Sequence, residues 1–284
     1  MSVNKNILHH QFYFISTPIG NIDDMTYRSV SIMSILDRIY AEDTRIAKKL
    51  FLHYGIKVPL YSLHEGNEKQ RIPEIISLLS EGNHIGLVSD AGTPLLNDPG
   101  YPLLKAFINH SISFTVLPGS CSPICALVLS GLPLNRFEYH GFVSDNSSEL
   151  KDHLIYCLAL QHTSVLLLQK RMVTKVIELI NHFEPSRELA LVKELTKIHE
   201  QVFRGSASAL ETMIKNGAIN LNGEFILICS PNQITDKFNP SSDQLLFARS
   251  LIKVVSPSKA ATLLTKHFGG SKKEWYSLCV TQQW

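Results

Sequence analysis

The sequence predicts an α/β protein whose first half is built on a parallel sheet, and two observations predict it. Short apolar runs alternate with segments whose apolar residues recur at helical spacing, as when helices connect parallel strands. In addition, each of the five runs is followed by a polar or Gly/Pro-rich cluster, and the clusters read TPIGN, AEDTR, LHEGN, SDAGTP and PGSCS. Because the carboxyl ends of parallel strands share one sheet edge, where ligands bind in open α/β folds, we expect the clusters to form a ligand site.

The expected elements of the first half follow this alternation. Apolar runs predict strands at 12–16, 38–41, 58–63, 84–88 and 114–117. Helical spacing predicts helices over 25–35, from 42 onward, over 72–80 and over 102–109. Asp23 or Asp24 is expected to cap the first of these helices, because a carboxylate oxygen accepts the free N–H groups of a first turn.

The second half predicts a smaller sheet and a helical tail. Residues 131–142 show no strong periodicity and are interpreted as a connection between domains. Strands are expected at 164–168, 188–192, 200–204 and 224–229, with a helix over 173–183. A polar, proline-containing linker is expected at 230–243, before two or three short helices. The predicted domains are therefore an N-terminal α/β domain at 10–133, a C-terminal α/β domain at 137–235 and a helical segment at 243–284.

Composition sets the broad class. The chain has 284 residues, 44% of them hydrophobic and 18% charged, and a net charge of +2. These values indicate a soluble globular protein and neither require nor exclude a nucleic-acid partner. No apolar run is long enough to cross a membrane and no signal peptide is recognised at the N-terminus, so neither a membrane nor export is expected.

The five cysteines include no CxxC pair. Cys121 and Cys125 are four residues apart and could share a helix face, but no histidine cluster lies near them in the sequence. We therefore expect free thiols in a reducing cytoplasm and no metal site.

The run Ser89 to Gly100, SDAGTPLLNDPG, is the most informative stretch. It follows an apolar strand and carries two glycines, two prolines and two aspartates. Gly92 permits a ligand to approach the backbone closely, while Pro94 and Pro99 stiffen the loop. A plain turn is the alternative interpretation. The chain contains neither GxGxxG nor GxxxxGK[ST], so a Rossmann dinucleotide site and a P-loop are not supported.

These motifs occur in a specific order together with GLPLNRF, KELTK and NGEFIL. The chain thereby resembles the tetrapyrrole methylase superfamily, and within it the enzymes that methylate the ribose 2′ oxygen of a cytidine in 16S rRNA. The resemblance implies two α/β domains with S-adenosylmethionine in the cleft between them, and a helical C-terminal segment. It also implies 16S rRNA in the small ribosomal subunit as partner, a homodimer and a cytoplasmic location.

The resemblance and the chemistry of methyl transfer together predict the site residues. The cofactor is expected to contact residues of three loops, namely Pro18, Ile19, Asp90, Ala91, Gly92, Thr93, Pro94, Leu96, Ser122 and Pro123. A ribose hydroxyl reacts once its proton is drawn away, so charged groups near the cofactor are catalytic candidates: Glu42, Asp43, Lys193 and Glu194. Substrate contacts are expected from Arg45, His64, Asn67, Lys272 and Lys273.

Most of these residues also have an ordinary structural interpretation. Glu42 and Asp43 could be favourable charges at a helix N-terminus. His64 could be a turn residue or a catalytic group, the segment 193–197 a solvated charged strip, and Thr93 a side chain bonded to nearby backbone. Trp275 and Tyr276, beside the two lysines of the tail, could stack on RNA or pack within the tail.

Two segments depart from the family pattern. Gln169 stands where the family usually carries a glutamate, and residues 143–152, VSDNSSELKD, form an acidic loop where a basic one is common. A glutamine does not act as a base, and an acidic loop does not attract phosphates. Two other functions therefore stay open: a diverged methyltransferase that acts on another RNA or a small molecule, and an RNA- or partner-binding module without catalysis.

Overall fold

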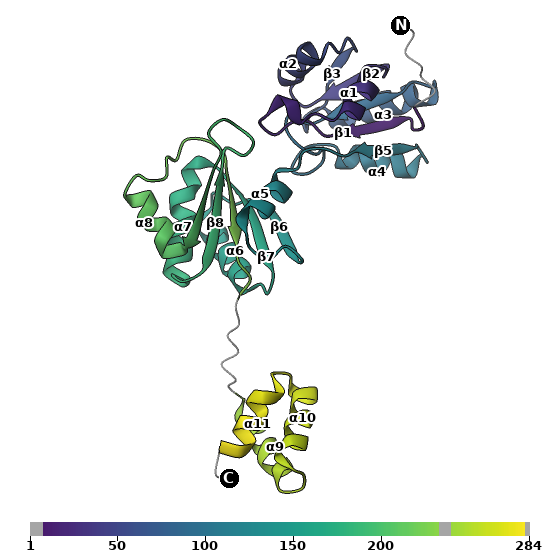
Figure 1. Cartoon of the computed structure of the whole chain (residues 1–284). Coiled ribbons are helices and arrows are strands. Elements are labelled where there is room, and N and C mark those ends of the chain that lie inside the picture. Colours follow the sequence, from purple (N-terminus) through teal and green to yellow (C-terminus); the bar gives the residue numbers. More distant parts are fainter. Residues whose placement is uncertain (1–7, 233–239, 282–284) are drawn as a thin grey trace. The chain divides into compact units, whose positions relative to one another are not determined.

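The computed structural model describes residues 8–232 and 240–281 (Figure 1). The chain forms two compact units, Met1–Pro231 and Asn232–Trp284. The first unit holds two sheets with their helices, and the second is helical. The α/β fold class is confirmed. The three domain boundaries stay a prediction.

The first sheet has the expected parallel order. Its strands are β1 Phe12–Ile15, β2 Arg38–Ala41, β3 Leu60–Ser62, β4 Ile85–Val88 and β5 Phe114–Leu117. They are arranged β3-β2-β4-β1-β5, and every pair is parallel. Every residue of β1 and β4 is buried, which is why these strands are continuous apolar runs rather than alternating ones. All five polar clusters consequently follow the same edge of one sheet.

Helices cover both faces of this sheet. Helices α1 Tyr27–Met33 and α2 Thr44–Tyr54 pack on the face that carries Ile15 and Ile39. Helices α3 Glu68–Ser80 and α4 Tyr101–Asn109 pack on the face that carries Phe14 and Tyr40. The predicted cap of α1 is wrong: Thr26 accepts the N–H of Ser29, and the two aspartates lie in a separate turn of 3₁₀ helix, Ile22–Asp24.

The second sheet is mixed and, with five strands, equal in strand number to the first. Its strands are β6 Phe137–Phe142, β7 Thr163–Leu168, β8 Glu188–Lys193, β9 Gln201–Ser206 and β10 Phe225–Cys229, in the order β6-β7-β10-β8-β9. The expectation of a smaller sheet was therefore wrong. The segment 131–142 is also not a plain connection, because it contains the edge strand β6, which runs parallel to β7.

Four helices cover the second sheet. Helix α5 Ser122–Ser130 packs on one face, and α6 Ser147–Ala159, α7 Val173–Phe183 and α8 Ala207–Lys215 pack on the other. The acidic segment 143–152 is not a loop throughout, because its second half is the start of α6. Asn146 begins that helix by accepting the N–H groups of Ser148 and Glu149.

The second unit is a three-helix bundle, as the tail pattern predicted: α9 Ser242–Ile252, α10 Pro257–Phe268 and α11 Lys272–Thr281. Trp275 is 2% exposed and lies in the core of this bundle with Ala260 and Leu264, so of its two interpretations packing within the tail matches its position. Tyr276 is exposed. Half of the expected linker, 233–239, lies outside the described residues.

Among the described residues, none of the helices combines the length and apolarity that crossing a bilayer requires.

Candidate functional site

A cavity of about 420 Å³ lies at the carboxyl edge of the first sheet. One part of its wall comes from the loops after β1, β4 and β5, through Ile19, the segment 91–93, the segment 96–98 and the first turn of α5. The other part comes from the second sheet, through Tyr139, Phe142, 167–169, Val192, Leu195 and 223–226. This size is typical of a small-molecule site, and the position is the ligand-binding edge of an open α/β sheet.

The loop after β4 is joined to the loop after β1 by backbone hydrogen bonds. The N–H of Thr17 donates to the carbonyl of Gly92 at 2.9 Å, and the N–H of Gly92 donates back at 3.1 Å. Gly92 has a φ of +83°, and a Cβ at this position would lie 3.3 Å from a methyl group of Ile19. Both the conformation and the space favour glycine. The cavity wall here is therefore backbone that a ligand can approach closely.

Thr93 ties three strand ends together. Its hydroxyl donates to the carbonyl of Ser120 at 3.2 Å, and the hydroxyl of Ser16 donates to it at 3.3 Å. The local side-chain-to-backbone bond considered from the sequence is thus a long-range bond, from the β4 loop to the β5 loop. Thr93 fixes the cavity wall as well as lining it.

Two non-glycine residues of the β4 loop have a left-handed backbone. Leu95 has a φ of +73° and Asn97 a φ of +69°, a region that costs energy for residues with a Cβ. The Asn97 carboxamide oxygen accepts the hydroxyl of Tyr139 on β6, and both residues line the cavity. The strained loop is therefore held by a contact to the second sheet.

Three carboxylates gather beside the cavity. Burial, together with the nearby charges of Glu42 and Asp90, raises the pKa of Asp98 to about 6. Burial and the charge of Asp90 likewise raise the pKa of Glu42. Asp98 lines the cavity, and its Oδ2 is buried without a hydrogen-bond partner among the described residues. A carboxylate with a pKa near neutrality at a cavity wall is suited to accepting a proton or to facing a cation.

Asp43 and Arg45 satisfy each other. Asp43 caps α2 by accepting the N–H of Arg45, and its carboxylate also accepts the guanidinium at 2.6 Å. These bonds lower the pKa of Asp43 to about 2. The backbone N–H of Asp43 donates to Asp90 at 2.9 Å. Neither Asp43 nor Arg45 lines the cavity, so the interpretation of Asp43 as a helix-cap charge matches its position.

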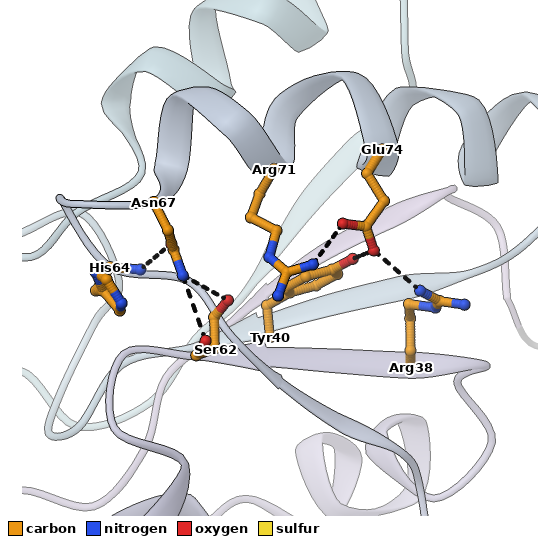
Figure 2. Close-up of polar contacts among 7 residues, drawn as sticks. All are labelled: Arg38, Tyr40, Ser62, His64, Asn67, Arg71 and Glu74. Atoms are coloured by element: carbon orange, nitrogen blue, oxygen red, sulfur yellow. Dashed lines mark hydrogen bonds and ion pairs between the residues drawn. The ribbon is translucent and has the colours of Figure 1, made fainter.

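Asn67 uses its side chain within its own turn, as Figure 2 shows. Its carboxamide oxygen accepts the N–H of His64 at 2.9 Å, and its NH₂ donates to the carbonyl and hydroxyl of Ser62 at 3.3 Å each. The His64 ring is exposed and close enough to Glu42 for its charge to lower that pKa. The LHEGN turn is therefore closed internally, and the side chains of His64 and Glu65 face solvent.

A second polar network holds the same turn against the sheet. Glu74 of α3 accepts Nη1 of Arg71 at 2.6 Å, the hydroxyl of Tyr40 at 3.1 Å and Nη1 of Arg38 at 3.4 Å (Figure 2). Arg38 also lies over the ring of Tyr61, 4.7 Å from its centroid. The network joins α3 to β2 and β3, so it supports the loop and does not face the cavity.

The KELTK segment supports the second-sheet side of the site. Glu194 accepts the N–H of Glu224 at 2.8 Å and the ammonium of Lys197 at 3.1 Å, and these bonds lower its pKa. Thr196 accepts the N–H of Asn21 at 3.0 Å, which joins this segment to the loop after β1. Lys193 is 5% exposed. Neither catalytic candidate of this segment lines the cavity, whereas Glu224 does.

Gln169 lies in the cavity wall and accepts Nε of Arg171 at 2.9 Å. Arg171 also pairs with Asp145 of the acidic segment. One of the negative charges that counted against RNA binding is thus paired with an arginine at the surface. Position 169 itself carries no carboxylate. Among the described residues, Asp98 and Glu224 are the carboxylates that line the cavity, and burial raises the pKa of Asp98.

The predicted site residues separate into two sets. Those in the cavity wall are Ile19, Ala91, Gly92, Thr93, Leu96, Ser122 and Pro123. Those outside it are Pro18, Asp90 and Pro94 of the cofactor set, together with all the catalytic and substrate candidates. Lys272 and Lys273 are exposed at the start of α11, in the other unit. Sequence reasoning missed Asn97, Asp98 and Tyr139; the first two belong to the SDAGTPLLNDPG run, so that signal was available.

Comparison with known proteins supplies the family. The model of the tetrapyrrole (corrin/porphyrin) methylases matches residues 11–211. The chain belongs to the tetrapyrrole methylase family. Among relatives, ribosomal RNA small subunit methyltransferase I of Escherichia coli O157:H7 is 34% identical over 275 residues, covering 96% of both chains. The protein of the same name from Hydrogenobaculum sp. is 37% identical over 222 residues, covering 78% of this chain and 95% of that one.

Solved structures carry the same fold. Diphthine synthase superposes with a TM-score of 0.61 at 11% identity, covering 77% of this chain and 89% of that one. Uroporphyrin-III-C-methyltransferase from Thermus thermophilus gives 0.55 at 20% identity, covering 81% of this chain and 99% of that one. These two similarities concern the fold alone. The resemblance recognised from the motifs is confirmed, for the family and for the branch that carries the rRNA methyltransferase name.

Proposed function

We propose that this chain is a methyltransferase that transfers the methyl group of S-adenosylmethionine to the ribose 2′ oxygen of a cytidine in 16S rRNA. The observation that carries the proposal is the 34% identity to ribosomal RNA small subunit methyltransferase I over 96% of both chains. Identity over this length includes the helical tail as well as the two sheets. The fold alone would not select an acceptor, because one fold serves many substrates.

The cavity fits the cofactor in size and in charge. Its volume of about 420 Å³ suits a ligand of this class, and its wall offers backbone from the β4 loop and the free N–H groups of the first turn of α5. Asp98 has a buried oxygen without a hydrogen-bond partner among the described residues. Its negative charge in the cavity wall would stabilise a cationic ligand. We assign Ile19, Ala91, Gly92, Thr93, Leu96, Ser122 and Pro123 to cofactor binding.

When bound, S-adenosylmethionine supplies a methyl group that is already activated by the sulfonium. The protein therefore contributes mainly alignment and removal of the proton from the attacking hydroxyl. Asp98 is the candidate acceptor of that proton, because its raised pKa makes it a competent base near neutrality. The charge of the nearby Glu42 contributes to this raised pKa. Asp43 and Glu194 are assigned structural roles, since their partners hold their pKa values low.

RNA contact is assigned to exposed groups outside the cavity. His64 lies on the loop that follows β3 and Arg45 in the first turn of α2, which follows β2, at the same sheet edge as the cavity. Lys272 and Lys273 contribute charge from the helical unit. We further propose that the chain acts in the cytoplasm as a homodimer, as its family resemblance implies.

The test is methyl transfer to small ribosomal subunits from cells that lack this modification. Purified chain is incubated with the subunits and S-adenosylmethionine carrying a labelled methyl group, and label in 16S rRNA is counted. Label in the rRNA supports the proposal. Cofactor binding without label in the rRNA contradicts it and favours a different acceptor, an alternative for which the replacement of glutamate by Gln169 in the cavity wall is the specific observation. Absence of both favours the binding module without catalysis.

A further inference from the structure

A group of side chains that can bind a metal lies outside the cavity, between the edge strand β6 and helix α6. His140 of β6 meets His153 and Cys157 of α6, and one nitrogen or sulfur atom from each lies within 4.8 Å of the others. His153 and Cys157 are four residues apart, so they project from the same face of the helix. Spacing in the sequence does not reveal this group, because 12 residues of chain lie between His140 and His153.

His140 reaches α6 because β6 is irregular at this point. In the pairing with β7, Tyr139 lies opposite Val165 and Gly141 lies opposite Leu166, which leaves His140 as the extra residue of a bulge. Gly141 completes the bulge with a φ of +65°. Bulges re-aim side chains. Here Tyr139 lines the cavity while His140 is directed to the helix.

The ring of His140 is held as in a metal site. Its side chain is 6% exposed, and its Nε2 is buried without a hydrogen-bond partner among the described residues. Its Nδ1 lies 3.8 Å from Glu138. Metal-bound histidines characteristically direct the second ring nitrogen to a carboxylate, which fixes the ring and the tautomer. An unpaired buried nitrogen is costly, and a bound cation would satisfy it.

Glu138 is itself fixed from two further sides. It accepts Nε2 of His162 at 3.1 Å and the hydroxyl of Tyr156 at 3.1 Å. The thiol of Cys157 is 1% exposed and belongs to no disulfide.

We propose that His140, His153 and Cys157 bind a zinc ion that joins α6 to the edge strand β6. Two imidazoles and one thiolate are a donor set typical of this borderline-soft ion, with a fourth position left for solvent. In a tetrahedral site the donor atoms lie about 3.3–3.7 Å apart, so closure needs side-chain shifts of about 1 Å. The partly exposed His153 is free to make such a shift.

The charges and the protons of this step balance. Zn²⁺ replaces the proton of the Cys157 thiol, forming the zinc–sulfur bond and releasing one H⁺ to solvent. The thiolate and the Glu138 carboxylate then offset the two positive charges of the ion. Because Tyr139 and Phe142 of β6 line the cavity, an ion at this position would also stiffen that part of the cavity wall.

Metal uptake by the full-length chain tests the proposal. The protein is stripped of metal under reducing conditions and titrated with Co²⁺, whose thiolate charge-transfer absorption reports sulfur ligation, and then with Zn²⁺ in competition. We expect one ion per chain, a thiolate band, and a zinc affinity weakened at least about 100-fold in His153→Gln and in Cys157→Ser. Glu138→Gln should weaken it about 10–100-fold.

Two matched controls separate this site from adventitious binding. Cys125→Ser changes a thiol on α5, and His182→Gln changes an exposed histidine on α7; both should bind zinc as the unaltered chain does. If Cys157→Ser does not fold, the partly exposed His153→Gln still decides the question. Protection of Cys157 from alkylation by added Zn²⁺, read by mass spectrometry, is a second measurement. Absence of a thiolate band, or equal zinc affinity in both variants and controls, overturns the proposal.

Discussion

Two loops at the same edge of the first sheet look alike in sequence and differ in structure. The His64–Asn67 turn after β3 and the Ser89–Gly100 loop after β4 both combine polar residues with glycine. The side chain of Asn67 forms its hydrogen bonds with the neighbouring residues Ser62 and His64. The β4 loop instead bonds to neighbouring loops, holds two non-glycine residues at positive φ and leaves a buried oxygen of Asp98 unpaired. Composition thus predicts that both loops lie at the ligand-binding edge of the sheet. The hydrogen-bond partners of their polar groups then distinguish a structural turn from a ligand-binding loop.

The largest expected effect comes from filling the β4 loop wall. Thr93→Arg places a long charged side chain where the hydroxyl now bonds Ser120, at the surface of the cavity. We expect at least a 100-fold loss of S-adenosylmethionine affinity, about 3 kcal/mol, measured by calorimetry. Thr212→Arg on the exposed surface of α8 is the matched control and should bind normally. Normal affinity in Thr93→Arg would remove the β4 loop from the cofactor site.

Asp98→Asn should separate activity from stability. Loss of the proton acceptor is expected to lower kcat about 100-fold at saturating cofactor, and loss of the negative charge from the cavity wall should also weaken the affinity for the cationic cofactor. Single-turnover methyl transfer measures it, with Asp24→Asn as a control on the exposed surface. An unchanged kcat would show that the proton leaves by another route.

The same substitution makes a stability prediction. The folded pKa of Asp98 is about 6, above the ordinary 3.8, so the folded state binds more protons between these values. The free energy of unfolding therefore falls as pH rises from about 4 to about 6, and the loss persists at higher pH. Asp98→Asn should raise that free energy by about 1–2 kcal/mol at pH 8, after allowance for partial solvent access. Urea unfolding at pH 4.5 and pH 8 measures it, and a gain equal at both pH values would contradict the shift.

Asn67 and His64 test the turn that is closed on itself. Asn67→Ala removes three hydrogen bonds and should cost about 1–2 kcal/mol in the free energy of unfolding, with cofactor affinity unchanged. His64→Ala, which removes an exposed ring, should change stability by less than about 0.5 kcal/mol. Chemical denaturation of the two variants gives both values. If His64→Ala were more destabilising than Asn67→Ala, the side chain of Asn67 would not be the group that closes the turn.

The smallest effect is expected from the helical unit. Replacing Lys272 and Lys273 with serine should flatten the dependence of log K on log salt for rRNA binding by about 1.5, because each phosphate contact contributes about 0.7–0.9. The double variant Lys151→Ser, Lys215→Ser, on α6 and α8, is the control. Filter binding at several salt concentrations measures the slopes. Equal slopes would exclude these two lysines from phosphate contact.

The sequence predicted the first sheet well because its signals are local. Strand β2 and strand β5 were predicted at their observed bounds, and the parallel arrangement followed from strands that alternate with helices, whereas no strand order was predicted. The second sheet was harder. Strand β6 mixes aromatic, charged and glycine residues around a bulge, so neither period nor composition marks it. Its position depends on pairing with β7 across more than 20 residues of chain.

Only part of the site was predicted, again because local sequence signals reveal a motif but not the contacts between distant segments. Gly92 and Thr93 were found because a short motif carries them. Asp98 was missed within that motif, since its raised pKa arises from burial beside Glu42, which comes from the end of β2, and beside Asp90 at the start of the same loop. Conversely, Asp43 and Glu194 have the right chemistry in sequence, but local partners occupy their carboxylates.

The most direct test of the account is the identity of the methylated nucleoside. Small subunits that lack the modification are treated with the chain and S-adenosylmethionine, and the 16S rRNA is digested to nucleosides for mass spectrometry. We expect 2′-O-methylcytidine to be formed by the unaltered chain and by Thr212→Arg but not by Thr93→Arg. A methyl group on a base, or no methylated nucleoside while the chain binds the cofactor, would contradict it.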